Sequence, residues 1–279
     1  NNLPRLPSKF AYTNKQRVLV IASRGITARY RHLLEDLKKL VPHHKTDSKL
    51  DDKGDVHAVN EIAEFKSCNQ ILYLETRKHS DLYLYVGRTP HGPSAKFQVV
   101  NVHTMDELKL TGNCMLGSRP LLDFDSSFDR APHLQLMKAM LSDAFGTPLG
   151  HPKSKPFLDR VMCFYLVKNN IWVRNYQIVD TSATTKEKET TLVEIGPRFV
   201  LIPIRIFMGS LGGPTLYQNM SYVSPNTERS IAKKAKGNRY AERVQHSLER
   251  KQFVSENQMP RDELSSKNVF GTVSVQGSD

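Results

Sequence analysis

The stretch HGPSAKFQVVNV (residues 91–102) has a counterpart later in the chain, IGPRFVLIPIRI (residues 195–206). In both, a Gly-Pro pair precedes a run rich in β-branched and aromatic residues, the composition of a strand that begins after a turn. The order of expected elements before each pair is also the same: a strand, a helix and further strands. This repeat predicts a mixed α/β fold of two pseudo-symmetric half-domains. Chance similarity between two ordinary α/β segments is the alternative.

We assign residues 15–116 to the first half and residues 117–208 to the second. In the first half, strands are expected at 17–25, 70–77, 81–87 and 97–102, with one helix from Thr27 to Val41 and another capped by Asp55. In the second half, a helix is expected at 131–145 and strands at 119–125, 160–167, 171–179, 191–195 and 199–207.

The first Gly-Pro turn superficially imitates a nucleotide site. Gly87 and Gly92 are four residues apart, as in a P-loop, but Pro93 stands where a P-loop has lysine and supplies no N–H group. A strand rather than a helix follows, so a β-turn is expected. The chain also has no H-E-x-x-H or G-x-S-x-G motif and no metal-ligand spacing. We therefore expect a non-enzymatic protein with no catalytic residue, no cofactor, no metal and no small-molecule substrate.

The composition favours a polyanionic partner. Forty Lys and Arg residues against 28 Asp and Glu give a net charge of +12 and a pI near 9.6, which favours nucleic acid first and an acidic membrane second. No run reaches the roughly 18–20 apolar residues of a membrane span, and the N-terminus has no signal-peptide pattern. Three separate cysteines without a C-x-x-C pair argue against a disulfide framework and fit a reducing compartment.

Basic residues gather near expected turns and helix ends, where free N–H groups attract phosphate. Trp172 and Arg174 are two apart on a strand, so both should face one way, where the ring can stack on a base; a single tryptophan is also common in cores. Some of these charges are expected to be ordinary solvated side chains. The candidate RNA-binding residues are Arg24, Arg29, Arg31, Lys38, Lys39, His43, His44, Lys45, Lys49, Arg77, Lys78, Arg88, Lys96, Arg119, Lys153, Lys155, Arg174, Arg198, Lys233, Lys234, Lys236 and Arg239.

The remaining segments differ in character from the two halves. Residues 1–14 form an N-terminal arm, 209–226 an ordered linker and 227–279 a basic helix with an extended tail. Ser224 followed by proline predicts the helix start, and Gly237 should weaken the helix. The apolar stripe of this helix is too narrow for a core and suits a helix that lies on RNA or on a partner protein. Its candidate partner-binding residues are Tyr240, Val244 and Leu248.

Taken together, several blocks resemble the Brix family of nucleolar ribosome-assembly proteins over residues 15–226. These blocks are SRGITARYRHLLEDL (23–37), KHSDLYLYV (78–86), HGPSAKF (91–97), HTMDELKLTGNC (103–114), GSRPLLDFD (117–125), SKPFLDRV (154–161), VEIGPRFV (193–200) and GGPTLYQNMSYVSPN (212–226). TGNC and YVSPN are similar to the founding member of the family. The short, mixed-charge loop at 180–191 departs from the longer acidic insertion that is common in the family.

The resemblance implies a duplicated Brix fold whose halves are each similar to the anticodon-binding domain of class II aminoacyl-tRNA synthetases, followed by a C-terminal helical extension. It implies a nucleolar, non-enzymatic factor that binds pre-rRNA in large-subunit precursors and supports rRNA folding and processing. The expected partners are pre-rRNA, ribosomal proteins, other assembly factors and one dedicated assembly-factor partner. A role in the small-subunit or 5S particle pathway, and a protein–protein adaptor with little RNA contact, are the alternatives.

Overall fold

The computed structural model describes residues 16–48, 50, 56–108, 112–148, 150–181, 189–257, 262–265 and 269–270. The chain divides into two compact units, residues 1–222 and 223–279. The first unit contains β1 (Val18–Ala22), α1 (Ala28–Leu40), β2 (His44–Thr46), α2 (His57–Phe65), β3 (Gln70–Arg77), β4 (Asp81–Arg88), β5 (Ser94–His103), α3 (Met105–Leu108), β6 (Pro120–Phe124), the 3-10 helix η1 (Ser126–Arg130), α4 (Pro132–Phe145), β7 (Arg160–Val167), β8 (Asn170–Thr181), β9 (Glu189–Glu194), β10 (Arg198–Phe207) and β11 (Thr215–Gln218). The second contains α5 (Pro225–Glu256).

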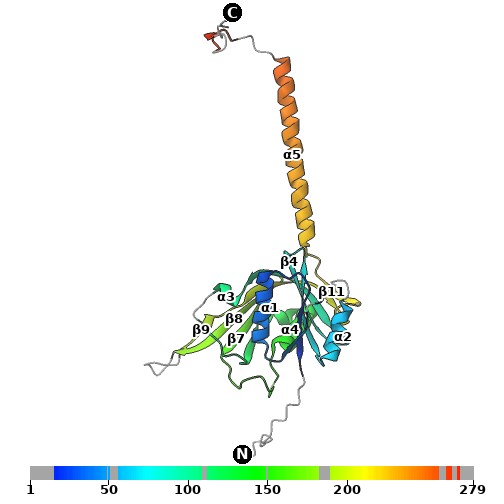
Figure 1. The fold of residues 1–279 in the computed structure, drawn as a ribbon, viewed down its shortest axis with the longest axis vertical. Coiled ribbons are helices and arrows are strands. Elements are labelled where there is room, and N and C mark those ends of the chain that lie inside the picture. The colour runs from blue at the N-terminus through cyan, green and yellow to red at the C-terminus, as the bar shows by residue number, and fades with distance from the viewer. Residues whose placement is uncertain are drawn as a thin grey trace, which may run out of the picture. The chain divides into compact units, whose positions relative to one another are not determined.

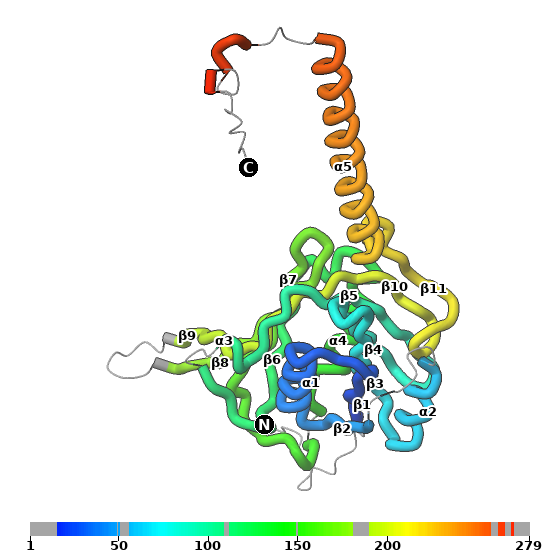
Figure 2. Tube along the Cα trace, turned by 45° about the horizontal axis from the view of Figure 1, so that its top comes forward, coloured from blue at the N-terminus to red at the C-terminus, as the bar shows by residue number. Residues whose placement is uncertain are grey.

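One sheet runs through the first unit in the order β2-β1-β3-β4-β5-β10-β8-β7-β6, with β11 beside β10 and β9 beside β8 (Figures 1 and 2). The two strands that follow the Gly-Pro pairs, β5 and β10, lie next to each other and are antiparallel. On one side of this pair β1 and β3 are parallel and β3, β4 and β5 are antiparallel. On the other side β6 and β7 are parallel and β7, β8 and β10 are antiparallel. The four strands β1, β3, β4 and β5 therefore pair in the same directions as β6, β7, β8 and β10, although β2, α2 and β9 have no counterpart on the other side.

Alternation along the strands divides the sheet into two faces. On the inner face, alternate residues such as Leu84 and Phe97 pack with α1 and α4 in one large apolar core. On the outer face, Tyr73 and Tyr85 pack with α2 and with Leu211 in a second, smaller core. Most members of this second core come from β1, β3, β4 and α2 in the first half of the sheet, with Leu211 and Ile204 added from β10 and the segment after it.

The Gly92-Pro93 turn is held against the segment that follows β10. Gly92 has φ +87°, a conformation that glycine adopts without strain. Ser94 fixes the same contact, because its Oγ donates to the Gly209 carbonyl at 2.8 Å and accepts from the Leu211 N–H at 2.9 Å. Gly196 before β10 also has a positive φ, +76°. Both turns thus begin a central strand, as the repeat predicted.

Several local expectations need correction. The segment at His44–Thr46, expected as a loop, is strand β2, which pairs in parallel with β1. The expected linker 209–226 contains β11, which extends the sheet beside β10. Thr27 stands at the N-cap of α1 but makes no side-chain capping hydrogen bond, and the expected cap Asp55 lies outside the described residues.

The second unit is described by its helix. α5 has 32 residues, which at 1.5 Å per residue is about 48 Å. It begins where predicted, because Ser224 accepts a hydrogen bond from the Thr227 N–H at 3.2 Å. It passes through Gly237 without a break, and none of its residues is buried. No helix in the described part of the chain is long and apolar enough to cross a membrane.

Candidate nucleic-acid interface

The outer face of the second half carries aromatic and basic side chains. On β8, Ile171 and Val173 point into the core, so Trp172 and Arg174 between and beyond them lie on the outer face. The Arg174 guanidinium lies over the Trp172 ring, 5.4 Å from its centroid. Tyr165 of β7 stands opposite Trp172 in the ladder and is 39% exposed. We call this set, together with Arg198, the outer-face cluster.

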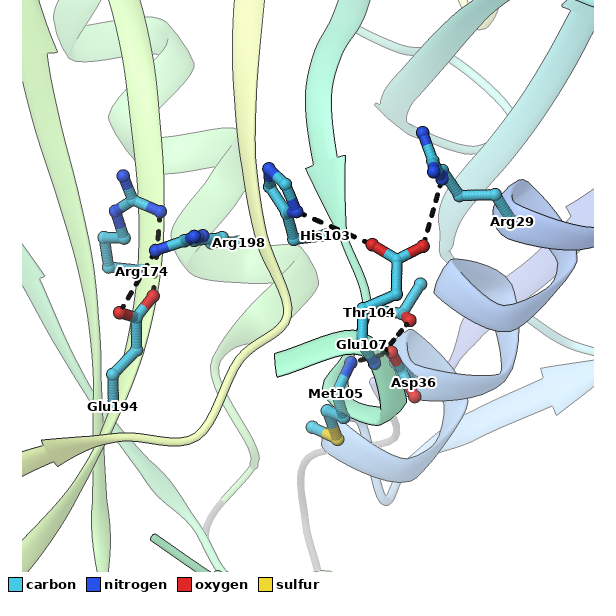
Figure 3. A network of polar contacts seen from close by, with 9 residues as sticks. All are labelled: Arg29, Asp36, His103, Thr104, Met105, Glu107, Arg174, Glu194 and Arg198. Carbon is cyan, nitrogen blue, oxygen red and sulfur yellow. Dashed lines mark hydrogen bonds and ion pairs between the residues drawn. The ribbon is translucent and has the colours of Figure 1, made fainter. Parts of the chain in front are cut away.

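Arg174 and Arg198 share one carboxylate. Glu194 of β9 lies with one oxygen 3.6 Å from Arg174 and the other 3.6 Å from Arg198 (Figure 3). Two guanidinium groups against one carboxylate leave a net positive charge. A cavity of about 240 Å³ opens here, lined by Trp172, both arginines and residues of β5 and β10. Such a site offers a ring for stacking and cations for phosphate.

The adjoining corner is fixed by a separate set of polar contacts (Figure 3). Asp36 of α1 is buried and accepts the Met105 N–H at 2.9 Å, which holds the start of α3. Burial raises the pKa of this carboxyl above its ordinary value, against the opposing effect of that hydrogen bond. Glu107 of α3 accepts a hydrogen bond from Arg29 Nε at 3.0 Å, and its other carboxylate oxygen lies 3.5 Å from His103 Nδ1. Arg29 is therefore an ion-pair partner, though it is still mostly exposed.

A second group of candidates meets between the two halves. His43, His44 and Lys45 at the start of β2 lie with Lys153 from the loop before β7 around a cavity of about 280 Å³. Arg17, His151 and Pro152 complete its lining, and we call it the seam cavity. Nearby, the buried Arg160 donates to the Leu40 carbonyl at 2.5 Å and to the Ser118 carbonyl at 3.2 Å, and so ties the end of α1 to the second half.

Two candidates have side chains that the fold largely encloses. His43 is 1% exposed, and its ring meets the His151 ring with centroids 6.0 Å apart. The Lys96 side chain is 16% exposed and points into the outer core. There its Nζ donates to the Tyr85 hydroxyl at 2.5 Å and lies 3.6 Å from Glu75. Burial lowers the pKa of Lys96, although Glu75 opposes this shift.

Other candidates have acidic partners within the protein. Arg88 donates from Nε to Asp143 of α4 at 2.8 Å, and Arg77 donates to Glu75 at 2.6 Å. Lys38 donates to Glu35 at 2.8 Å, and Lys39 lies 3.9 Å from Asp36. These pairs are at least partly exposed on the basic side, so they weaken but do not remove the positive field.

The remaining candidates are spread over the surface. Arg24, Arg31 and Lys78 are exposed. Arg119 donates to the Pro156 carbonyl at 3.0 Å, which places it beside the loop that carries Lys153 and Lys155. Lys49 lies outside the described residues. The four basic candidates of α5 are exposed in the second unit, as are the three candidate partner-binding residues; these seven are Lys233, Lys234, Lys236, Arg239, Tyr240, Val244 and Leu248.

Sequence reasoning missed Arg17, His103, Tyr165 and Glu194 as members of these sites. Strand alternation alone placed Tyr165 on one face of its strand, but the pairing of β7 with β8 was needed to bring it opposite Trp172. Arg17 reaches the seam cavity only because β2 pairs with β1. Within the described ranges, no group of three His, Cys, Asp or Glu residues is arranged to hold a metal ion.

Comparison with known proteins shows which sequences and structures this chain is similar to. The sequence model of the Brix domain matches residues 23–205. The chain is 49% identical over 245 residues to the human ribosome biogenesis protein BRX1 homolog, covering 88% of this chain and 67% of the relative. It is 47% identical over 264 residues to ribosome biogenesis protein BRX1 of Saccharomyces cerevisiae, covering 93% and 91%. The solved structure of a probable ribosomal biogenesis protein from Aeropyrum pernix K1 aligns with a TM-score of 0.44 at 16% identity, over 73% of this chain and 99% of that one.

Proposed function

Because the chain belongs to the Brix-domain family, we propose that it is a non-enzymatic ribosome assembly factor that binds pre-rRNA in nucleolar precursors of the large subunit. Relatives that carry the name ribosome biogenesis protein support the assembly role. The outer-face cluster is the observation that supports RNA as the ligand. Its partners would be pre-rRNA, ribosomal proteins and other assembly factors, among them one dedicated partner. A role in the small-subunit or 5S particle pathway is the alternative within the family.

The proposal assigns separate tasks to the ring and the cations of the cluster. Trp172 would stack on an unpaired base, and Arg174 and Arg198 would contact the adjacent phosphates. Stacking on an aromatic ring contributes about 1–3 kcal/mol per base, whereas phosphate contacts supply affinity without reading sequence. The expected ligand is therefore RNA in which unpaired, splayed bases lie next to a helix.

We further propose that the two halves arose by duplication and are each similar to the anticodon-binding domain of class II aminoacyl-tRNA synthetases. The equal strand connectivity on both sides of the β5–β10 pair supports duplication. The half-domain boundaries at residues 15–116 and 117–208 follow from it. On this proposal the functional difference between the halves lies in what covers their outer faces.

Measurement of RNA affinity with purified protein tests the proposal. We expect Trp172→Ala to weaken binding to RNA with unpaired bases by roughly 5- to 100-fold, and Trp172→Phe to retain most of the affinity. Arg174→Ala should also weaken binding, and Arg130→Ala is its matched control for a lost cation, since Arg130 ends η1, which packs with α4 on the inner side. For about 5–8 phosphate contacts, a plot of the logarithm of the RNA association constant against the logarithm of the salt concentration should have a slope of roughly −4 to −7. A slope near zero would contradict the RNA-binding role and favour the alternative of a protein–protein adaptor with little RNA contact.

A further inference from the structure

The charged residues that line the seam cavity are all basic. Apart from Pro152, each of its lining residues carries a cation or an imidazole, and none carries a carboxylate. With neutral histidines, Arg17, Lys45 and Lys153 give a charge of three. Like charges gathered in one cavity repel each other unless an anion occupies it. The lining also joins residues more than 100 positions apart, since Arg17 and His151 come from different halves.

His43 supplies a second, independent observation. Its ring is 1% exposed, and neither ring nitrogen has a hydrogen-bond partner in the described structure. A neutral imidazole carries one N–H donor and one acceptor nitrogen. A buried polar group without a hydrogen-bond partner lowers the stability of the folded state by roughly 1–3 kcal/mol. Because His43 lines a cavity, a bound ligand can supply the missing hydrogen bond.

The neighbouring groups are set to donate rather than to accept. The Lys153 N–H donates to His151 Nδ1 at 3.2 Å, which places the proton of the neutral ring on Nε2. The two rings meet edge to face with centroids 6.0 Å apart. Lys45 uses one of its three donors on the Lys66 carbonyl at 2.7 Å. The Arg17 backbone N–H donates to Asn69 Oδ1 at 2.8 Å, and its guanidinium, which lines the cavity, carries five N–H donors.

From this geometry we propose that the seam cavity binds a phosphate group, held by Arg17, Lys45 and Lys153 with His43 as a buried donor. Phosphate carries up to two charges and several acceptor oxygens, which matches three cations and an N–H donor better than a single carboxylate does. The cavity volume of about 280 Å³ is near the lower end of small-ligand sites. It suits a phosphate with its attached sugar. The inference rests on the proposed function only in taking RNA as the source of that phosphate.

The site should respond to pH. Burial, with His151 and His44 nearby, lowers the pKa of His43 to about 4, and burial also lowers the pKa of His151. The other groups facing these rings are Arg17, His44, Lys45 and Lys153, which all disfavour a further positive charge. A bound phosphate reverses that balance and favours the imidazolium forms. Phosphate binding should therefore be coupled to proton uptake by these two rings.

Titration of the full chain with inorganic phosphate at constant ionic strength, followed by NMR of the histidine ring protons, tests the inference. We expect saturable shifts at His43 and His151, and about tenfold or more weakening by Arg17→Gln or Lys153→Gln. Both sites are at least partly exposed, so these variants should fold. Arg130→Gln, a cation removed elsewhere, should leave phosphate binding unchanged. The absence of saturable shifts, an equal loss in the control, or equally tight binding of an acidic peptide would each overturn the inference.

Parallel titrations with a nucleoside 5′-monophosphate and with single-stranded RNA distinguish the sources of the phosphate. Weaker binding of both by Arg17→Gln assigns the cavity to nucleic acid. If Arg17→Gln weakens the binding of phosphate but leaves the affinity for RNA unchanged, the cavity binds phosphate and its natural ligand is free phosphate rather than RNA. RNA binding that depends on Trp172, without any phosphate binding in the cavity, overturns this inference while the proposed function stands.

Discussion

Replacement of Gly92 by alanine tests whether the first Gly-Pro turn is a structural lock. Gly92 has φ +87°, where an L-residue costs about 1–2 kcal/mol. A Cβ there would lie 2.4 Å from the Met208 carbonyl oxygen and 2.4 Å from the Gly209 carbonyl carbon, and relief of such an overlap adds about 1–3 kcal/mol. Alanine also restricts the unfolded chain, which offsets about 0.4–1 kcal/mol. The free energy of unfolding should therefore fall by about 2–4 kcal/mol, and by more for Gly92→Val.

Two other glycines provide matched controls. Gly150 has φ +74° but no atom within 4 Å of its Cβ position among the described residues, so Gly150→Ala should lose only about 0.5–1 kcal/mol. Gly212 has neither constraint, and Gly212→Ala should be neutral or slightly stabilising. Urea unfolding followed by far-UV circular dichroism gives all three values. If Gly92→Ala destabilises no more than Gly150→Ala, the contact with residues 208–209 is not a lock and the reasoning is refuted.

Three further predictions concern charge and helix stability. Buried His43 stays neutral down to pH near 4, whereas the unfolded ring binds a proton near its ordinary pKa, so the free energy of unfolding should fall by up to about 3 kcal/mol as pH falls from 6.5 to 4. His43→Leu should flatten this part of the pH profile, and an unchanged profile would contradict the assignment. A double-mutant cycle of Arg88 and Asp143 should give a coupling energy below about 1 kcal/mol, because Arg88 is half exposed; a value above 2 kcal/mol would mark a structural pair. Gly237→Ala should raise helix content, since glycine in an exposed helix costs about 1 kcal/mol relative to alanine, and circular dichroism before and after the change measures it.

Local sequence patterns predicted most of the elements but not their neighbours. The β-branched and aromatic content of RVMCFYLV and IWVRNYQIV predicted strands β7 and β8. Their two-residue spacing placed Trp172 and Arg174 on one face, because successive side chains of a strand point to opposite faces. β2 escaped prediction because a three-residue strand has no readable period and exists only through pairing with β1. The burial of His43 follows from that pairing, so it could not be predicted either.

Charged residues show the same division between local and tertiary information. Lys96 was a candidate RNA contact because it flanks the first Gly-Pro turn. Its partners, Glu75 and Tyr85, come from β3 and β4, and only the order β3-β4-β5 brings them under Lys96. Arg88 and Asp143 likewise meet across the two halves. RNA-binding candidates that are chosen from the sequence alone therefore include cations that pair with acidic or tyrosine side chains in the folded protein.

The two candidate sites follow from one difference between the halves. In the first half, the connection from α1 to β3 contains β2 and α2, and α2 closes the outer face over β3 and β4. In the second half, the equivalent connection from α4 to β7 contains no helix or strand in its described residues, 146–148 and 150–159. The outer face around Trp172 is therefore left open. The same helix-free connection carries His151 and Lys153 to the edge at β2, where they form one wall of the seam cavity. Insertion of a helix in place of this connection should cover the first site and abolish the second, because residues 146–148 and 150–159 contain no element that covers either site.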